Sequence, residues 1–288
     1  MLDPAEIDSQ ADLIEHTLQE IKGLVSLPEV YQKVRNLIDD PNSDIEHFVE
    51  VVASDSNLSV AVLRVANSAF FGFPGKIDSL SRAVNMLGIG QLHDLVLATS
   101  AIASLKLSNE IMPLKTFWRF SLFSAVLTRL LASQLKFPKS ERLFVIGLLY
   151  EIGHLVLYAK HPELAKRAME LSRNNQELLH IAEQKLLGMH YGEIGAKLMA
   201  QWCLPAHFQD IVHYQPTPDL APDQRRETAL LHLVRACAEK YISGHMRAIE
   251  ESVSADIWEI LQLNAEQLAE TVEQALKAAT EMEKLMFN

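Results

Sequence analysis

The sequence predicts an all-α protein, and three observations support this fold class. Apolar residues recur at steps of three and four along most of the chain, which places them on one face of successive helices. Glycine and proline interrupt the pattern, and serine, aspartate or asparagine stands at several of the restarts, as at helix N-termini. No stretch of useful length alternates apolar and polar residues, so no β-strand is expected.

The first third of the chain is divided into short helices by clear stop signals. Helices are expected at residues 7–21, 27–38, 45–52, 55–71, 80–87 and 91–105. Ser26 and Glu29 form a capping box for the second of these, and Ser43 or Asp44 caps the third. Residues 72–75 (Gly-Phe-Pro-Gly) end the fourth helix firmly.

The last two of these helices meet at a corner formed by residues 88–90 (Gly-Ile-Gly). Such a corner also occurs in helix-turn-helix DNA-binding motifs. The second helix carries His93 and Asp94 among apolar residues and has no arginine or lysine that would contact phosphate. We therefore do not expect this element to bind DNA.

The remaining helices are more apolar and are interrupted by short turns. They are expected at residues 117–135, 143–158, 177–187, 191–202, 204–213 and 228–242, with two more between residues 254 and 285. Asn264 is expected to cap the last helix. Residues 108–113 are the best linker candidate, and residues 216–222 hold three prolines and must form a loop.

The composition is that of a soluble globular protein. The 288 residues are 49% hydrophobic and 22% charged, and the net charge is −11. This negative charge argues against nucleic acid or an anionic membrane surface as the main partner. The first ten residues are acidic and polar, unlike a signal peptide, and no apolar run approaches the ~20 residues of a membrane span. A cytoplasmic protein is expected.

The two cysteines indicate neither a disulfide framework nor a zinc site. Cys203 and Cys237 are too few for the first and lack the CxxC spacing of the second. Two buried free thiols are expected, and a single bridge between them is the alternative.

Three stretches of the sequence carry a resemblance to a known family. Residues 63–72 (LRVANSAFFG), followed by residues 77–88 (IDSLSRAVNMLG), resemble the signature of the HDOD domain. Residues 148–157 (LLYEIGHLVL) resemble the centre of the HD phosphohydrolases, in which a His-Asp pair in the same frame holds metal. The resemblance covers residues 24–245 and implies a bacterial signalling module that is a degenerate relative of those enzymes.

The resemblance also implies an HD-domain-like multi-helix bundle. A helical N-terminal HDOD half at residues 1–110 is expected to pack on a helical HD-like half at residues 111–245. A C-terminal helical extension at residues 246–288 completes the expected organisation.

The resemblance further indicates where metal ligands would stand, and most of these positions are changed. The candidates for a ligand pocket are therefore Phe120, Tyr150, Glu151, His190, His213 and Arg235. Phe120 replaces a first histidine, Tyr150-Glu151 replaces the His-Asp pair, and Arg235 replaces a late aspartate. His190 is retained, and His213 is the one histidine retained from a later pair.

The replacements are poor ligands for a catalytic metal. Phe120 has no donor atom, Tyr150 is a phenol with an ordinary pKa of about 10, and Arg235 would put a fixed positive charge where cations should sit. We therefore expect a degenerate site without metal or other cofactor, in which the histidines are hydrogen-bonded in a polar pocket. The alternative is a single Zn²⁺ held by Glu151, His190 and His213.

The HDOD signature supplies a second group of candidate residues. Asn67 and Ser68 are expected to cap a turn or to bridge the two halves by hydrogen bonds, and the alternative is a contact to a partner or ligand. Phe70, Phe71 and Phe73, around Gly72, are expected to pack in the core or between the domains, and an exposed aromatic patch there would instead be a binding surface. Three further histidines are expected at the surface or in loops: His154, His161 and His180.

The sequence therefore predicts a non-catalytic bacterial signal-transduction or regulatory protein that binds a partner protein or a small ligand. The alternative function is metal-dependent hydrolysis of a nucleotide or cyclic dinucleotide, and a third is a scaffold with a vestigial pocket. The expected partners are signalling proteins contacted in trans, with a small anionic ligand as a further candidate. Neither nucleic acid nor a membrane is expected as a partner, and the protein is expected to be a monomer or a homodimer.

Overall fold

The computed structural model describes residues 19, 29–68, 70–73, 75–104, 111–138, 140–175, 178–243 and 249–287. The described residues form helices, turns and bends, and no strand occurs among them. This confirms the predicted all-α class. The expected helix at residues 7–21 and its neighbour Ser26 lie outside the described residues, apart from Gln19, which is helical.

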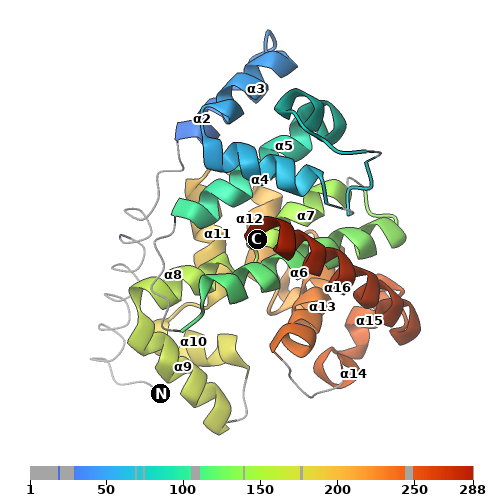
Figure 1. Cartoon of the computed structure of the whole chain (residues 1–288). Helices are drawn as coiled ribbons and strands as arrows, with labels where there is room; N and C mark the ends of the chain where they lie inside the picture. Colours follow the sequence, from blue (N-terminus) through green and yellow to red (C-terminus); the bar gives the residue numbers. More distant parts are fainter. Residues whose placement is uncertain are drawn as a thin grey trace. The chain divides into compact units, whose positions relative to one another are not determined.

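Figure 1 shows the described helices in chain order. Their bounds are α2 Glu29–Asp39, α3 Ile45–Ala53, α4 Ser56–Ala66, α5 Leu80–Ser104, α6 Leu114–Gln134, α7 Ser140–Leu149, α8 Ile152–Lys160, α9 Pro162–Asn175, α10 Leu179–Leu187, α11 Tyr191–Gln201, α12 Ala206–Tyr214, the 3₁₀ turn η1 Pro218–Leu220, α13 Arg225–Ser243, α14 Ile249–Ser252, α15 Ala255–Leu261 and α16 Ala265–Phe287.

The chain divides into two compact units, each built from separated segments. Among the described residues, unit 1 contains residues 19, 111–116 and 150–232, and unit 2 contains residues 29–104, 117–149 and 233–287, with the gaps given above. The described residues of the predicted segment 246–288 fall within unit 2, whereas the described residues of segment 111–245 contribute to both units. The three-segment organisation stays a prediction, because compactness alone does not define domains.

In unit 2, helices α7 and α16 contact the largely buried helix α6. From Phe117 to Thr128 nearly every α6 side chain is buried, and α16 is tied to α6 by a hydrogen bond of 2.8 Å from Thr271 Oγ1 to Gln134 Oε1. α7 approaches α6 closely, since a Cβ atom on Gly147 would lie 2.6 Å from Thr128 Oγ1. In the same unit α5 packs against α2, α3, α4 and α7, and α16 packs against α4.

Local signals in unit 2 operate as the sequence predicts. The Asp44 side chain accepts a hydrogen bond from the His47 backbone and so caps α3. Gly88, with φ 77° and ψ 157°, makes the predicted corner inside the α5 segment, a conformation that favours glycine. Asn264 accepts a hydrogen bond of 2.9 Å from the Gln267 backbone at the start of α16, as expected of a cap.

Unit 1 contains α8 to α12, in which α11 packs against both α8 and α12. The contact between α8 and α11 is made backbone to backbone, because a Cβ atom on Gly153 would lie only 1.9 Å from the Tyr191 carbonyl oxygen. Gly192 faces α12 in the same way, since a Cβ atom there would lie 2.8 Å from the carbonyl oxygens of both Val212 and His213. Small residues therefore set the spacing of these three helices.

Three sequence predictions need correction. The single helix expected at residues 143–158 is two helices, α7 and α8, separated by a turn at Tyr150-Glu151. The loop expected at residues 216–222 contains the 3₁₀ turn η1. Cys237 is buried as expected, but Cys203 is exposed, because it stands with φ 53° in the turn that ends α11. Neither thiol forms a disulfide bond.

Among the described residues, one segment is long and apolar enough to cross a membrane by length and composition alone. This segment, Arg142–Lys160, includes most of α7 and all of α8, and 83% of its most apolar window is buried inside the protein. Such burial is typical of a core helix and fits a soluble protein.

Candidate functional site

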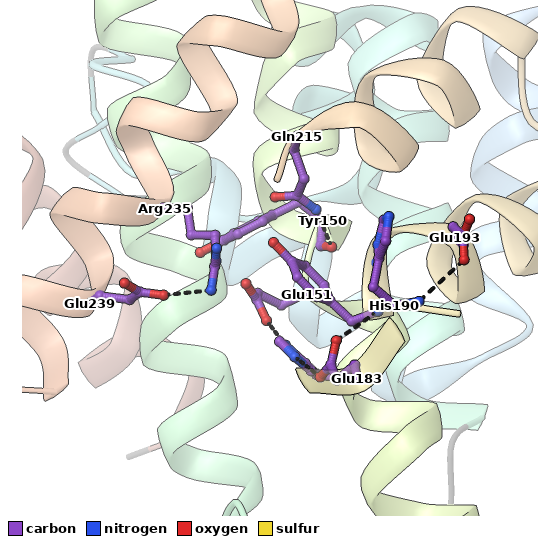
Figure 2. A network of polar contacts seen from close by, with 11 residues as sticks. Tyr150, Glu151, Glu183, His190, Glu193, Gln215, Arg235 and Glu239 are labelled. Carbon is purple, nitrogen blue, oxygen red and sulfur yellow. Dashed lines mark hydrogen bonds and ion pairs between the residues drawn. The ribbon is translucent and has the colours of Figure 1, made fainter. Parts of the chain in front are cut away.

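The turn between α7 and α8 positions the two residues that replace the His-Asp pair. Glu151 has φ −89° and ψ 6°, which is outside the helical region, and Tyr150 is fully buried. The break frees the Tyr150 carbonyl oxygen, which accepts a hydrogen bond of 3.0 Å from Nε2 of the buried Gln215 (Figure 2). The backbone oxygen of Gln215 in turn lies 2.8 Å from Nδ1 of His232. A buried side chain thus satisfies the backbone group that the turn exposes.

Glu151 takes part in a buried charged triad with His154 and Glu183. Its Oε2 atom forms a hydrogen bond with Nδ1 of His154, and Nε2 of His154 lies 2.9 Å from Oε1 of Glu183. The other oxygen of Glu183 accepts a hydrogen bond of 3.0 Å from the Tyr191 backbone. His154 and Glu183 are 4% and 1% exposed, and the side chain of Glu151 is 13% exposed, so the triad is largely buried.

The surroundings of His154 favour its charged form. Burial by itself lowers the pKa of His154, but the charges of Glu151 and Glu183 and their hydrogen bonds outweigh this effect and raise it to about 9. The ring stacks on Tyr191 with centroids 4.0 Å apart and on Tyr158 with centroids 5.3 Å apart. Aromatic faces attract a cation, which further favours the imidazolium.

His190 has a structural role at the start of α11. Its Nδ1 atom accepts a hydrogen bond of 3.1 Å from the Gly192 backbone, and Glu193 Oε2 accepts one of 3.2 Å from the His190 backbone. This is a capping box with histidine in the place of serine or threonine. Burial and the neighbouring His180 and His213 lower the pKa of His190 to about 4, so its ring is neutral near pH 7.

His190, Glu193 and His213 form the group of potential metal ligands that the described residues bring together. One ligand atom from each lies within 4.8 Å of the other two. The rings of His190 and His213 face each other edge to face with centroids 5.9 Å apart, and burial lowers the pKa of His213 as well. The carboxylate beside the two histidines is therefore that of Glu193, whereas the predicted Glu151 pairs with His154.

The hydrogen bonding of His190 does not suit a metal. A neutral imidazole that accepts a hydrogen bond at Nδ1 carries its proton on Nε2, which is then a donor without a lone pair. Metal-bound histidines have the reverse arrangement, with one nitrogen on the metal and the other donating its N–H. Metal binding by His190 would therefore break the helix cap, and the residues as arranged do not fit the ion.

Two of the predicted pocket residues, Phe120 and Arg235, belong to unit 2. Phe120 lies on α6 and is half-buried. Arg235 lies on α13 and forms an ion pair of 2.7 Å with Glu239 one turn later (Figure 2). The charge of Arg235 thus has a partner within its own helix, and its role in a ligand pocket stays a prediction.

The HDOD signature forms a second candidate site, in unit 2. Asn67 closes the loop after α4, because its amide donates to the carbonyl oxygens of Leu63 and Ile77 and accepts from the Ile77 backbone at 2.8 Å. The buried Ser68 donates to the Val65 carbonyl oxygen, so both residues stabilise a turn, one of the two expected roles. Gly72 follows with φ 62°, which allows the chain to reverse.

The aromatic residues of the signature are half-buried, and one of them, Phe71, lines a small cleft. Phe70 stacks on Phe144 with centroids 5.7 Å apart, and the Arg129 guanidinium lies 4.8 Å and 5.0 Å from the ring centroids of Phe70 and Phe71. The cleft is lined by Phe71, Gln91, Asp94, Leu95, Arg129, Phe144 and Val145. These residues come from the signature loop and from helices α5, α6 and α7, so the cleft is neither pure core nor a flat patch.

The sequence interpretation missed four residues of unit 1: His154, His180, Glu183 and Glu193. His154 and His180 were expected at the surface or in loops but are buried, at 4% and 6% exposure. Two sequence spacings could have indicated these contacts, since residues three apart meet in a helical turn. His154 stands three residues after Glu151, and Glu193 stands three residues after His190. Glu183 comes from a separate helix, and no local pattern indicated it.

Comparison with known proteins places the chain among relatives of the same fold. It is 25% identical to a candidate phosphohydrolase from Shewanella amazonensis SB2B, with a TM-score of 0.77 over 94% of this chain and 97% of that one. An HDOD domain protein of unknown function from Geobacter sulfurreducens is 19% identical, with a TM-score of 0.76 over 98% and 100% of the two chains. A candidate signal transduction protein from Marinobacter aquaeolei VT8 is 23% identical, with a TM-score of 0.73 over 98% and 66%.

An uncharacterized protein of Treponema pallidum (strain Nichols) is 21% identical over 284 residues, which are 97% of this chain. The chain spans about half of that relative, 54% of its length. The family profile of the HDOD domain matches residues 24–218, more than half of the chain. The protein therefore belongs to the HDOD domain family.

Proposed function

We propose that this HDOD protein is a non-catalytic regulatory protein that acts by binding a signalling protein in trans. The observation that carries the proposal is the engagement of Glu151, the carboxylate at the position of the metal-binding pair, by His154. A carboxylate that neutralises a buried side chain cannot also hold a catalytic cation without breaking that pair. Family membership and the relative from Marinobacter aquaeolei described as a signal transduction protein support a regulatory role.

The cleft of the HDOD signature supports the choice of a protein partner. It combines aromatic rings with an arginine and an aspartate, Arg129 and Asp94, and aromatic residues and arginine are enriched where proteins bind one another. Arg129 is held over two phenylalanine rings, so little side-chain freedom remains to be lost on binding. We place the partner-binding surface at this cleft.

A hydrolysis assay tests the absence of catalysis. The protein is incubated with Mn²⁺, Fe²⁺, Mg²⁺ or Zn²⁺ and a chromogenic phosphodiester, cyclic dinucleotides and nucleoside triphosphates, beside an active HD phosphohydrolase. We expect rates no higher than those of a Glu193→Gln, His213→Gln variant. Metal-dependent turnover that disappears in this variant would overturn the proposal.

Metal-dependent hydrolysis is the second candidate function, and one observation favours it. His190, Glu193 and His213 offer ligand atoms within 4.8 Å of one another. A rotation of the His190 side chain away from its capping hydrogen bond would allow the three residues to hold a single metal ion. The relative from Shewanella amazonensis described as a candidate phosphohydrolase points in the same direction. The assay above decides between the two functions.

Partner binding is tested with two matched variants. Gln91→Arg places a long charged side chain at the edge of the cleft, and Gln274→Arg makes the same change on the exposed face of α16. Partners captured from the native host by the wild-type protein are purified and titrated against all three proteins. We expect Gln91→Arg to weaken binding at least tenfold and Gln274→Arg to leave it unchanged. Equal binding by all three would remove the cleft as the interface.

A further inference from the structure

We propose that the partner of this protein binds the cleft of the HDOD signature with one aliphatic side chain that has a lysine or an arginine beside it. The cleft belongs to unit 2, as do all the residues that line it. The inference rests on the proposed function, in which this cleft binds a signalling protein, and deepens it by naming the chemistry of the segment that enters the cleft.

The size of the cleft favours the end of one side chain over a small molecule. The cavity volume is about 10 Å³, and all the empty space around it, open solvent included, is about 230 Å³. A single water molecule needs roughly 10–15 Å³ of such volume, whereas pockets for small molecules and cofactors are roughly 300–1,000 Å³. A methyl group is about as large as a water molecule, so an aliphatic end group fits and an aromatic ring does not.

The buried part of the lining is apolar. Leu95, Phe144 and Val145 are 4%, 5% and 1% exposed, and the half-buried Phe71 adds a further apolar surface. A polar group placed against these side chains would lose its water without gaining a hydrogen bond from them. The end of a valine, isoleucine, leucine or methionine side chain suits both this lining and the size of the cleft.

A carboxylate in the lining favours a positive charge beside that anchor. The side chain of Asp94 is 18% exposed, and its Oδ1 atom lies 3.1 Å from Nδ1 of His93. Among the described residues, Asp94 has no other hydrogen bond or ion pair, so its second oxygen can accept from a partner. The net charge of −11 also attracts a basic segment from a distance.

Arg129 by itself would favour an acidic segment, but the other charges outweigh it. Its guanidinium lies over the rings of Phe70 and Phe71, whose faces already offset part of its positive charge. An acidic residue in the cleft would also face the carboxylate of Asp94 and would be repelled by the net charge of the chain. The balance of charge therefore favours a basic neighbour for the anchor.

The turn of the signature holds one wall of the cleft in place. The Asn67 amide donates to the Ile77 carbonyl oxygen at 2.7 Å and accepts from the Ile77 backbone at 2.8 Å. This closes the loop that carries Phe71. Because little ordering is required on binding, even a short peptide with the right anchor should bind measurably.

Selection of short random peptides displayed on phage tests this chemistry on the full-length protein. Peptides that bind the wild type are kept only if they do not bind Gln91→Arg. We expect the kept peptides to share an aliphatic residue with a lysine or arginine close to it. A shared aromatic or acidic residue would overturn the inference and leave the cleft as the interface. If no peptide distinguishes the two proteins, the cleft is not the interface, and both the inference and the proposed interface fail.

Removal of one charge tests the role of Asp94. Asp94→Asn keeps the shape of the side chain and an oxygen that can accept from His93. Calorimetric titration is expected to show at least about tenfold weaker binding of a selected peptide, and less than about a twofold change for the same peptide with glutamine in place of its basic residue. Asp256→Asn, at an exposed position of α15, is the matched control and should leave both affinities unchanged. An equal loss for both peptides in Asp94→Asn would overturn the inference.

Changes to the anchor of the selected peptide test the size of the cleft. Alanine in its place would leave the apolar lining uncovered, and phenylalanine would exceed the available space. We expect each change to weaken binding to the wild type about tenfold or more. A peptide with phenylalanine that binds as well as the original would contradict the inference, because the cleft would then accept a ring.

Discussion

Of two buried histidines in unit 1, one is charged and the other neutral near pH 7, because their neighbours differ. His154 faces two carboxylates, which raise its pKa to about 9. His190 faces the rings of His180 and His213 and accepts a backbone hydrogen bond, and burial with these neighbours lowers its pKa to about 4. The same side chain thus serves as a cation in one place and as a helix cap in the other.

The opposite pKa shifts predict a stability profile with a maximum near pH 6.5. Between pH 6.5 and 9 the unfolded chain has lost the proton of His154 while the folded chain keeps it, so the free energy of unfolding falls by up to about 3 kcal/mol as the pH rises. Below pH 6.5 the unfolded chain protonates His190 while the folded chain does not, so stability falls again toward pH 4. Urea titrations at half-unit pH intervals measure the profile.

A control isolates the alkaline side of this profile. The variant His154→Gln is expected to lose the slope between pH 6.5 and 9 while it keeps the decrease toward pH 4. An unchanged alkaline slope in this variant would mean that another group titrates there.

At the scale of single residues, the sequence indicated which positions belong to the candidate site but not which side chains they contact. His190 and His213 were both named as pocket candidates from the family resemblance, and their ring centroids lie 5.9 Å apart. The engagement of Glu151 by His154 was not predicted, although the two residues stand three apart, because His154 was expected at the surface or in a loop. A carboxylate from a third helix, Glu183, completes the triad, and only tertiary structure brings it there.

The helices of unit 1 are positioned by contacts between backbones. Gly153 of α8 lies against Tyr191 at the start of α11, and no side chain fits between them. Helix length and amphipathicity were readable from the sequence, since the apolar spacing of most helices matched their observed bounds to within a few residues. Close approach was not, because a glycine in an apolar helix gives the same pattern whether it faces a neighbour or open space.

Replacement of Gly153 by alanine is predicted to be strongly destabilising. The added Cβ would stand 1.9 Å from a backbone oxygen, so α8 and α11 would have to separate and the triad beside them would be disturbed. We expect a loss of about 3 kcal/mol or more in the free energy of unfolding, measured by urea denaturation. Gly90→Ala is the matched control, because nothing lies within 4 Å of its Cβ position, and it is expected to be neutral or stabilising by about 0.5–1 kcal/mol. Equal effects would contradict this account of the packing.

At the scale of the whole molecule, the two compact units share one chain that passes repeatedly between them. Unit 2 takes α2 to α5, most of α6, α7 and the C-terminal helices, while α8 to α12 belong to unit 1. The all-α class and the HDOD family were predictable from spacing and signature. The interleaving was not, because sequence segments of similar composition do not reveal which of them fold together.

The interleaving predicts that residues 111–288 will not fold normally by themselves. This fragment lacks α2 to α5, so α7 loses its contact with α5 and α16 loses its contact with α4. We expect rapid proteolysis of residues 233–287 and poor dispersion of their amide signals, compared with the intact chain. A fragment with cooperative unfolding and protease resistance equal to the intact chain would show that the first helices are dispensable.

The pairing of α4 with α16 has a consequence for synthesis on the ribosome. α4 ends at Ala66 and α16 begins at Ala265, so about 200 residues must be translated before the two can meet. At typical elongation speeds this delay lasts on the order of 10–40 s, during which the apolar side of α4 cannot contact α16. A nascent chain with such a delayed contact is a natural client for chaperones that shield apolar segments at the exit tunnel.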